Sequence, residues 1–311
     1  MMESRSQVRV NVPASTANMG PGFDTIGMAF QLYSSVEMAV AETTAIELIG
    51  PDMQGLPADK SNLLYEVAAG LFREAGQSAP ELYIRTASDA PLTRGLGSSA
   101  AAIAGALVAA NHLLGEPYTR DELFRMGTLL EGHPDNIGAS LFGGVVVATM
   151  PEEKHQAIPY VRLDPPDELK TLAIIPDFPL STEKARNVLP QMYSKQDVIY
   201  NVGHSSLLVA ALAQGRLDLL SQAMKDRMHQ PYRAELVPGL SEILEGAAES
   251  GALGATLSGA GPTILCFYQT EEDLHNLSGF IESVMSKHGV SYRAMQLKPD
   301  KHGAQVVFEE R

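Results

Sequence analysis

Residues 91–101 read Pro91-Leu92-Thr93-Arg94-Gly95-Leu96-Gly97-Ser98-Ser99-Ala100-Ala101. The two glycines leave the backbone bare enough to lie against a bulky anion. The run at 100–114, AAAIAGALVAANHLL, is small and apolar and predicts a helix, because Ala is the best helix former. Such a helix directs its free N–H groups and the positive end of its dipole at the glycine loop, which favours phosphate. The hydroxyls of Ser98 and Ser99 can reach phosphate oxygens or a magnesium ion, so we predict a nucleotide phosphate site.

Other interpretations of this loop are weaker. A Walker A loop requires Gly-Lys-Ser/Thr, which is missing here. The Gly-x-Gly spacing loosely matches the dinucleotide fingerprint, which needs a strand entering the first glycine and an acidic residue about 20 residues later. Pro91 and Arg94 separate the nearest predicted strand, 82–86, from Gly95, and the acidic residue in range, Glu116, lies in a Gly-Glu-Pro turn. A plain glycine-rich helix start is the remaining alternative.

Composition narrows the class of protein. The 311 residues are 45% hydrophobic and 19% charged, which is typical of a globular protein of one large or two ordinary domains. The net charge of -14 argues against a nucleic-acid partner. The single cysteine, Cys266, excludes an intrachain disulfide and fits a reducing compartment. The first twelve residues lack the apolar region of a signal peptide, and no apolar stretch reaches the ~18 residues of a membrane span. We expect a cytoplasmic enzyme without a membrane partner.

The order of predicted elements indicates an α+β fold, because strand pairs mix with helices instead of alternating strictly with them. The predicted strands lie at 8–12, 33–41, 46–49, 82–86, 143–149, 170–175, 254–257, 263–268, 291–297 and 305–308. The predicted helices lie at 61–74, with Ser61 as a possible N-cap, and at 100–114, 121–130 after the cap Thr119, 196–214, 240–250 and 271–287. The polar, Pro-rich stretch 151–166 is the best linker candidate.

Two further segments carry clustered polar groups. Residues 13–24 surround Asn18 and Asp24 with Pro and Gly, and this amide and carboxylate could hold a ligand with an ammonium and a hydroxyl; an Asx-turn loop is the alternative. Residues 131–137 follow a predicted helix. There Glu131 could bind magnesium, and His133, Asp135 and Asn136 could orient a hydroxyl or take its proton. A polar helix-terminating loop is the alternative.

The remaining candidates are a turn and two cations. Residues 257–263 (LSGAGPT) join two apolar strands, and their amides could meet a phosphate or carboxylate unless they form only a tight turn. Arg186 lies in the segment 181–186, at the start of a predicted helix, and Arg233 ends the segment 226–233. Each arginine could bind a carboxylate or phosphate through two parallel hydrogen bonds, or could simply be solvated at the surface.

Taken together, these segments resemble the GHMP small-molecule kinases. Residues 91–100 match the central motif of that family, Pro-x-x-x-Gly-Leu-Gly-Ser-Ser-Ala, in full; residues 13–22 resemble its first motif and 257–262 its third. The motifs lie in the right order across nearly the whole chain. The resemblance implies an α+β fold with an N-terminal nucleotide-binding domain over 1–165 and a C-terminal ferredoxin-like domain over 166–311.

Within that family the chain resembles the branch that phosphorylates homoserine, on residues 13–24, 131–136, 181–190 and 226–233. The resemblance implies transfer of the γ-phosphoryl group of ATP to the hydroxyl of L-homoserine, in threonine biosynthesis. It places ATP on residues 91–101 with the phosphates at 95–99, the adenine near Asn62, and Mg²⁺ on Ser99 and Glu131. The implied substrate site consists of Asn18, Asp24, Asn136, Arg186 and Arg233. The implied catalytic residues are Asn136, Thr182 and Arg186, with Thr182 near the transferred phosphoryl group.

One departure concerns the base. Mevalonate kinase-like members place an aspartate at the reacting hydroxyl, where this chain has Asn136; phosphoryl transfer tolerates that, because positioning and charge neutralisation dominate it. The neighbouring Asp135 stays open as a base. The spacing from Glu131 to His133 is also shorter than in some members.

A mevalonate-type kinase, a nucleotide-binding oxidoreductase and a non-catalytic relative remain alternatives. The sequence does not determine the oligomeric state, and a homodimer stays open.

Overall fold

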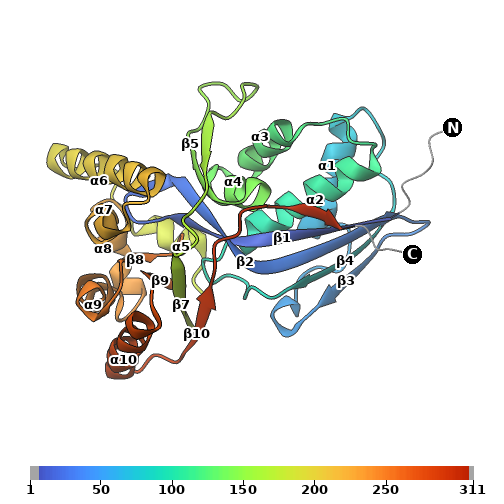
Figure 1. Cartoon of the computed structure of the whole chain (residues 1–311). Coiled ribbons are helices and arrows are strands. Elements are labelled where there is room, and N and C mark those ends of the chain that lie inside the picture. The colour runs from blue at the N-terminus through green and yellow to red at the C-terminus, as the bar shows by residue number, and fades with distance from the viewer. Residues whose placement is uncertain (1–6, 308–311) are drawn as a thin grey trace.

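The strands of residues 7–307, the part of the chain that this computed structural model describes, form two sheets (Figure 1). The first sheet has the order β11-β1-β2-β4-β3, and β5 and β6 extend it from β2. Its strands are β1 (Gln7–Asn18), β2 (Gly22–Val40), β3 (Ala45–Ile49), β4 (Leu82–Ser88), β5 (Val145–Ala148), β6 (Tyr160–Leu163) and β11 (Gln305–Val307). The second sheet has the order β10-β7-β9-β8 and comprises β7 (Lys170–Pro176), β8 (Gly254–Leu257), β9 (Ile264–Tyr268) and β10 (Tyr292–Leu297).

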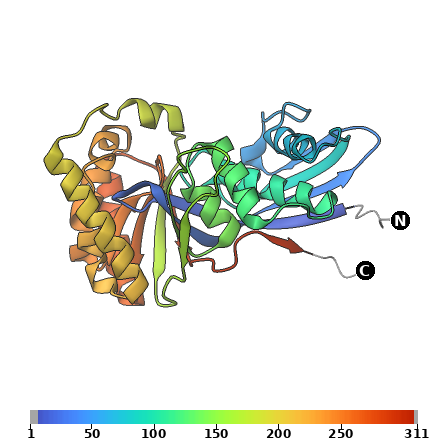
Figure 2. The same cartoon turned by 90° about the horizontal axis from the view of Figure 1, so that it is seen from above.

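The helices divide between the two sheets, which lie next to each other along the long axis of the molecule (Figure 2). Helices α1 (Leu63–Glu74), α2 (Ser98–Leu113), α3 (Arg120–Glu131) and α4 (Asp135–Phe142) belong to the first sheet. Helices α5 (Thr182–Asn187), α6 (Lys195–Gln214), α7 (Leu220–Ala223), α8 (Gln230–Arg233), α9 (Leu240–Gly246) and α10 (Glu271–Lys287) belong to the second. Short 3₁₀ helices lie at Pro51–Met53, Leu217–Leu219, Ala234–Leu236 and Ala248–Ser250.

Helix α2 occupies the centre of the first unit. It packs against β1 and β2 and against the neighbouring helices α1, α3 and α4, and most of its side chains are buried. A Cβ on Gly105 would lie 2.8 Å from Cγ2 of Val36 and 3.2 Å from Cγ2 of Val12. The small-residue run seen in the sequence therefore lets the helix approach the sheet closely.

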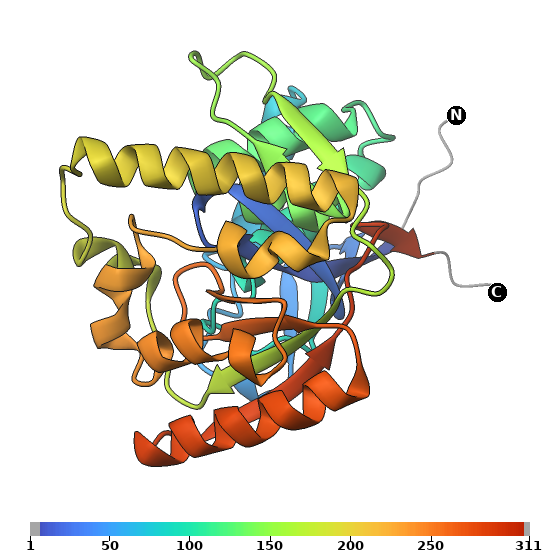
Figure 3. The ribbon, with the colours of Figure 1, turned by 60° about the vertical axis from the view of Figure 1, so that its left-hand side comes forward.

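The two units share a core. Met28 and Phe30 of β2 pack in one buried cluster with Ala173 and Ile175 of β7 and with residues of α6. The opposite face of the second sheet is covered by α9 and α10, so side chains of the second sheet are buried on both faces. Figure 3 shows α6 and α10 on either side of these strands. This packing holds the tip of the β1–β2 hairpin against the second unit.

The expected α+β class is confirmed. The second unit runs β7, helices, β8, β9, α10, β10, with the strand order β10-β7-β9-β8, which is the ferredoxin-like arrangement. The domain boundary at 165 and 166 remains a proposal. Strands β6 and β7 on either side of it lie in different sheets, while β11 returns to the first sheet and pairs with β1.

The structure corrects four expectations. Residues 13–24 form the ends of β1 and β2 and the turn between them, because backbone pairing continues to Asn18. Helix α4 was not expected; it is short and contains Gly and Ser. The proposed linker 151–166 contains β6, which pairs with β5. The N-cap of α1 is Asn62 and not Ser61, because the Asn62 side chain accepts a hydrogen bond from the N–H of Leu64. Residues 1–6 and Phe308 lie outside the described residues.

Within residues 7–307, none of the helices combines the length and apolar character that crossing a membrane requires.

Candidate active site

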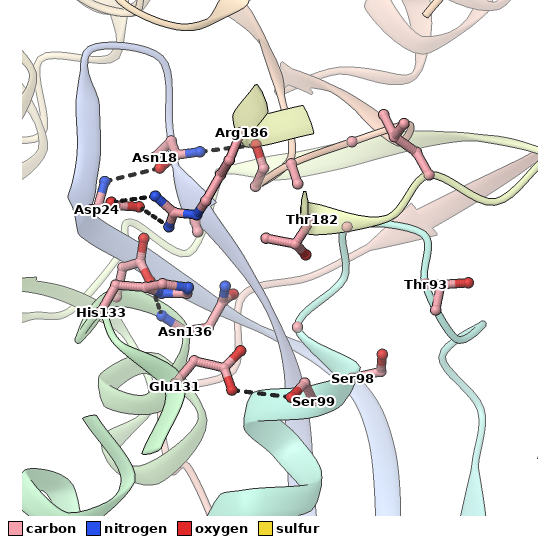
Figure 4. A pocket seen from close by; sticks show the side chains of 18 of the residues that line it. Asn18, Asp24, Thr93, Ser98, Ser99, Glu131, His133, Asn136, Thr182 and Arg186 are labelled. Carbon is pink, nitrogen blue, oxygen red and sulfur yellow. Dashed lines mark hydrogen bonds and ion pairs between the residues drawn. The ribbon is translucent and has the colours of Figure 1, made fainter. Parts of the chain in front are cut away.

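A cavity of about 260 Å³ lies where the β1–β2 hairpin, the glycine loop, the α3–α4 connection, α5 and the 259–261 turn meet (Figure 4). Its lining comes from segments more than 200 residues apart in the chain. The predicted site residues that line it are Asn18, Asp24, Thr93, Gly95, Gly97, Ser98, Ser99, Glu131, Asn136, Thr182, Arg186 and Arg233. The structure therefore brings the sequence motifs to one place.

The glycine loop forms one end of this cavity. Gly95 and Gly97 have φ of 81° and 67°, a region that favours glycine. A Cβ on Gly97 would collide with Oγ of Ser15, and a Cβ on Gly95 would collide with the carbonyl oxygen of Ser258. Helix α2 begins directly after Gly97, and no side chain within the described chain caps it. Its first N–H groups are thus available to an anion, as the sequence predicts.

Ser99 and Glu131 meet beside this helix end. Oγ of Ser99 donates to Oε2 of Glu131 at 3.0 Å, although the two residues are 32 positions apart. Burial raises the pKa of the Glu131 carboxyl above its usual value, against the lowering effect of His133 and Ser99. A hydroxyl and a partly desolvated carboxylate next to a phosphate site are the oxygen ligands that magnesium takes. These two residues therefore fit a Mg²⁺ ion bound together with phosphate.

Asp24 and Arg186 form the other end of the cavity. Two hydrogen bonds, of 2.9 and 3.0 Å, join the guanidinium of Arg186 to the two carboxylate oxygens of Asp24. Asn18 fixes the backbone here, since its Oδ1 accepts the N–H of Asp24 at 3.0 Å and its Nδ2 donates to the carbonyl of Gly259 at 2.9 Å. The cation and the anion that we predicted for a zwitterionic ligand thus hold each other in this structure.

Arg233 is buried, with 2% of its surface exposed. Its Nε donates to the carbonyl of Ala185 at 3.0 Å, and its Nη1 donates to the carbonyl of Gly259 at 2.9 Å. Nη2 has no hydrogen-bond partner among residues 7–307, and the side chain lines the cavity. Burial and the charge of Arg186 lower the pKa of Arg233 to about 10, so it stays cationic at neutral pH. It is not the surface arginine that we considered as an alternative.

The α3–α4 connection places three polar side chains between the two ends. Nδ1 of His133 lies 2.7 Å from Oδ1 of Asp135, which also accepts the backbone N–H of Asn136 at 2.7 Å. Oδ2 of Asp135 is sealed from solvent and has no partner in the described chain. Burial alone would lower the pKa of His133, but the hydrogen bond and charge of Asp135 raise it overall. Oδ1 of Asn136 accepts from Ser15 at 3.0 Å, which leaves Nδ2 to face the cavity.

A second cavity, of about 360 Å³, adjoins the first and shares Thr93, Ser98 and Ser99 with it. Its other walls are mostly apolar and come from several segments: Ser34, Val36, Leu48, Met53, Leu56, Pro57, Ser61, Asn62, Leu63, Leu64, Thr86, Ser88, Leu92 and Ala102. Asn62 is buried, and its Nδ2 donates to the carbonyl of Pro57 at 2.6 Å while its Oδ1 caps α1. A flat apolar group attached to a phosphate chain fits this arrangement.

Some predicted residues do not line either cavity. Pro91, Leu96, Ala100 and Ala101 are buried behind the loop, and Arg94 donates to the carbonyls of Leu92 and Asp177. The cavity is also lined by residues outside the implied site: His133, Asp135, Gly259, Ala260 and Gly261, which lie in the candidate segments 131–137 and 257–263, and Ala17, Leu180 and Ser181. The 257–263 motif and the polar cluster at 131–137 were available signals for most of them. The apolar cavity gave no local signal, because its walls are distant in sequence.

Comparisons with known proteins identify the family of the chain. The family model described as "GHMP kinases N terminal domain" matches residues 62–144, and the one described as "GHMP kinases C terminal" matches residues 208–287. A homoserine kinase of Deinococcus radiodurans is 46% identical over 297 residues, with 96% of each chain covered. One of Desulfitobacterium hafniense is 42% identical and covers 96% of this chain and 100% of its own. The crystal structure of a homoserine kinase from Cytophaga hutchinsonii superposes with a TM-score of 0.86 at 25% identity, covering 99% of both chains.

Proposed function

Because the chain belongs to the homoserine kinases of the GHMP kinase family, we propose that it transfers the γ-phosphoryl group of ATP to the side-chain hydroxyl of L-homoserine. The product would be O-phospho-L-homoserine, an intermediate for threonine synthesis. One observation carries the residue assignments: a phosphate-type helix end and an Asp–Arg–Arg set face each other across a single cavity.

ATP would bind across the two adjoining cavities. Its adenine would enter the apolar cavity beside Asn62, and its phosphates would lie on residues 95–99 at the start of α2. Ser99 and Glu131 would hold Mg²⁺, which neutralises phosphate charge when bound. The raised pKa of Glu131 supports this role, since a desolvated carboxylate gains most from a nearby cation.

L-Homoserine would bind at the other end. Nη2 of Arg233, which lacks a partner among the described residues, and the guanidinium of Arg186 would take the carboxylate. Asp24 would take the ammonium, with Asn18 holding the hairpin in place. Asp24 and Arg186 neutralise each other in this structure. Homoserine is a zwitterion, so its ammonium can replace Arg186 as the partner of Asp24 while its carboxylate replaces Asp24 as the partner of Arg186, and neither charge is left unpaired.

The transferred group would lie between the two ends, near Thr182 and Asn136. Nδ2 of Asn136 would donate to the reacting hydroxyl and align it with the γ-phosphate. Asp135 would act by orienting its neighbours, because its Oδ1 is engaged by His133 and Asn136 and its Oδ2 is sealed. Positioning and charge neutralisation would then drive the reaction, without a carboxylate base at the hydroxyl.

The same proposal includes the cellular location of the enzyme and its partners. We place the enzyme in the cytoplasm, which agrees with its one cysteine, a buried free thiol whose pKa burial raises to about 12. The net charge of -14 argues against nucleic acid as a partner.

A coupled assay of ADP release tests the function. We expect turnover with L-homoserine and ATP-Mg²⁺, and little or none with mevalonate, which lacks an ammonium for Asp24. Fluorescence titration with NADH should show no binding. Turnover of mevalonate without turnover of homoserine, or tight NADH binding, would overturn the proposal.

A further inference from the structure

His229 is a buried titratable side chain that the proposed reaction does not use. It is 0% exposed and precedes α8, four residues before Arg233. The ring stacks on Phe23 of the hairpin, with centroids 5.3 Å apart. It therefore lies between the hairpin that carries Asp24 and the arginine at the far wall of the cavity.

Both ring nitrogens of His229 have a partner. Nε2 lies 2.7 Å from the carbonyl oxygen of Gly20, which can only accept, so Nε2 carries the proton. Nδ1 lies 3.2 Å from Nη1 of Arg233, which can only donate, so Nδ1 presents its lone pair. One ring satisfies both contacts only as the neutral Nε2–H tautomer.

The surroundings favour this neutral form. Burial lowers the pKa of His229, and the cationic Arg233 lowers it further. Asp226, 3.6 Å from Nε2, and the more distant Asp24 oppose that effect. Asp226 is itself engaged, because its oxygens accept the N–H groups of Met228, His229 and Gln230 and the Nδ2 of Asn201.

The contact with Nδ1 sets the orientation of the Arg233 guanidinium. Nη1 is then occupied by His229 and the carbonyl of Gly259, and Nε by the carbonyl of Ala185. These three acceptors fix the planar group through Nε on one edge and Nη1 on the other, and Nη2 is left without a partner among the described residues. The hydrogen bond from Nε2–H of His229 also holds the carbonyl of Gly20, at the tip of the hairpin. The hairpin packs closely here, because a Cβ on Gly20 would collide with the carbonyl of Met224.

We propose that His229 is a positioning residue for amino-acid binding: its Nδ1 holds Arg233 so that Nη2 faces the substrate carboxylate, and its Nε2–H holds the hairpin that carries Asp24. This inference rests on the role proposed for Arg233. Because Nδ1 and Nε2 of His229 have different partners, the two contacts can be removed separately by mutation.

Two substitutions divide the tasks. In His229→Asn, Oδ1 is as many bonds from Cβ as Nδ1 and can accept from Arg233, but the bond to Gly20 is lost. In His229→Gln, Nε2 is as many bonds from Cβ as the ring Nε2 and can donate to Gly20, but the acceptor for Arg233 is lost. We expect His229→Gln to raise KM for homoserine roughly tenfold, the cost of one hydrogen bond to a charged group. His229→Asn should raise it by less than about threefold, and both should leave KM for ATP unchanged and lower Tm similarly.

Equal effects of the two variants on KM for homoserine would show that the two ring nitrogens do not have the separate roles proposed and would overturn the inference, as would an unchanged KM in His229→Gln. Arg233→Lys separates this from a failure of the proposed function. If wild type does not phosphorylate homoserine, or Arg233→Lys leaves KM for homoserine unchanged, the function or the role of Arg233 fails first, and the inference fails with it. A large effect of Arg233→Lys without a difference between Asn and Gln overturns the His229 inference alone.

A measurement on the wild-type enzyme keeps the inference testable if either variant fails to fold. Histidine ring ¹⁵N spectra should show one of the eight histidines as a neutral Nε2–H tautomer that does not titrate between about pH 6 and 8, where an unperturbed histidine changes charge. Absence of such a ring, or its presence only as the Nδ1–H tautomer, would contradict the inference.

Discussion

At one end of the cavity the first N–H groups of α2 face the space without a side-chain cap, whereas at the other end Asp24 and Arg186 already hold each other through two hydrogen bonds. The first end is made of contiguous backbone from the glycine loop. The second is made of side chains from β2, α5 and α8, which also bond to the carbonyls of Ala185 and Gly259. Both ends belong to the same cavity but satisfy their polar groups differently.

This difference has a consequence for binding. An anion can occupy the helix end without displacing a protein contact, so the phosphate end is ready before its ligand arrives. A ligand at the Asp24–Arg186 end must break an ion pair and replace it. An unpaired charge in a partly buried site costs free energy. Only a molecule with both a carboxylate and an ammonium provides a new partner for both Asp24 and Arg186. We infer that affinity for phosphate resides in the backbone and selectivity for an amino acid in the ion pair.

The largest expected effect is at the phosphate end. Ser99→Ala should lower kcat at least ~100-fold, because one ligand of the phosphate-bound metal is lost. Ser98→Ala, one residue earlier on the same turn, is the matched control and should cost only a few-fold. Steady-state rates over a range of Mg²⁺ concentrations would measure both. Near-wild-type turnover of Ser99→Ala would remove Ser99 from the metal site.

The residues between the two ends test the absence of a base. Asn136→Ala should lower kcat about 100-fold through loss of alignment of the hydroxyl. Asp135→Asn should cost less than about tenfold and keep the acid limb of the pH–rate profile, which a carboxylate base at this position would set. Rates of both purified variants, with folding checked by circular dichroism, decide the order. The reverse order would make Asp135 the general base.

A substitution at the amino-acid end should change KM for homoserine. Arg233→Lys keeps the charge but loses the planar guanidinium, so KM for homoserine should rise roughly tenfold while KM for ATP stays nearly constant. Initial-rate kinetics with each substrate varied in turn would show this split. A rise in KM for ATP alone would assign Arg233 to the nucleotide.

The smallest effect concerns His133 and pH. Its pKa is raised above 6.5 by Asp135 despite burial. The folded state therefore holds this proton more tightly than the unfolded state, so the stability it contributes is complete below pH 6.5 and is lost as pH rises through the raised pKa. The free energy of unfolding in urea should fall more steeply from about pH 6 to 9 for wild type than for His133→Gln. Parallel curves for the two proteins would contradict the raised pKa.

The two ends also differed in how far the sequence predicted them. The phosphate end is local: the glycines, Ser99 and the helix lie within one stretch, and the positive φ angles at Gly95 and Gly97 follow from residue type. For the amino-acid end the sequence predicted the residue types but not their partners. The pairing of Asp24 with Arg186, and the burial of Arg233 against carbonyls of Ala185 and Gly259, depend on segments that only tertiary packing brings together.

The missed elements have local reasons. Helix α4 spans eight residues, carries Gly138 and Ser140 and follows Pro134, so its pattern resembles a loop. Strand β6 lies in a polar, Pro-rich stretch and is defined by its pairing with β5. The role of Asn62 as the N-cap of α1 depends on side-chain geometry that its neighbour Ser61 could equally have offered.

The central claim, that the Asp24–Arg186 end selects an amino acid, is tested most directly with 4-hydroxybutanoate, which has the chain, carboxylate and hydroxyl of homoserine but no ammonium. We predict that wild type favours L-homoserine over 4-hydroxybutanoate by at least ~100-fold in kcat/KM, and that Asp24→Asn loses most of this preference. Equal kcat/KM values for the two compounds with the wild-type enzyme would contradict the account.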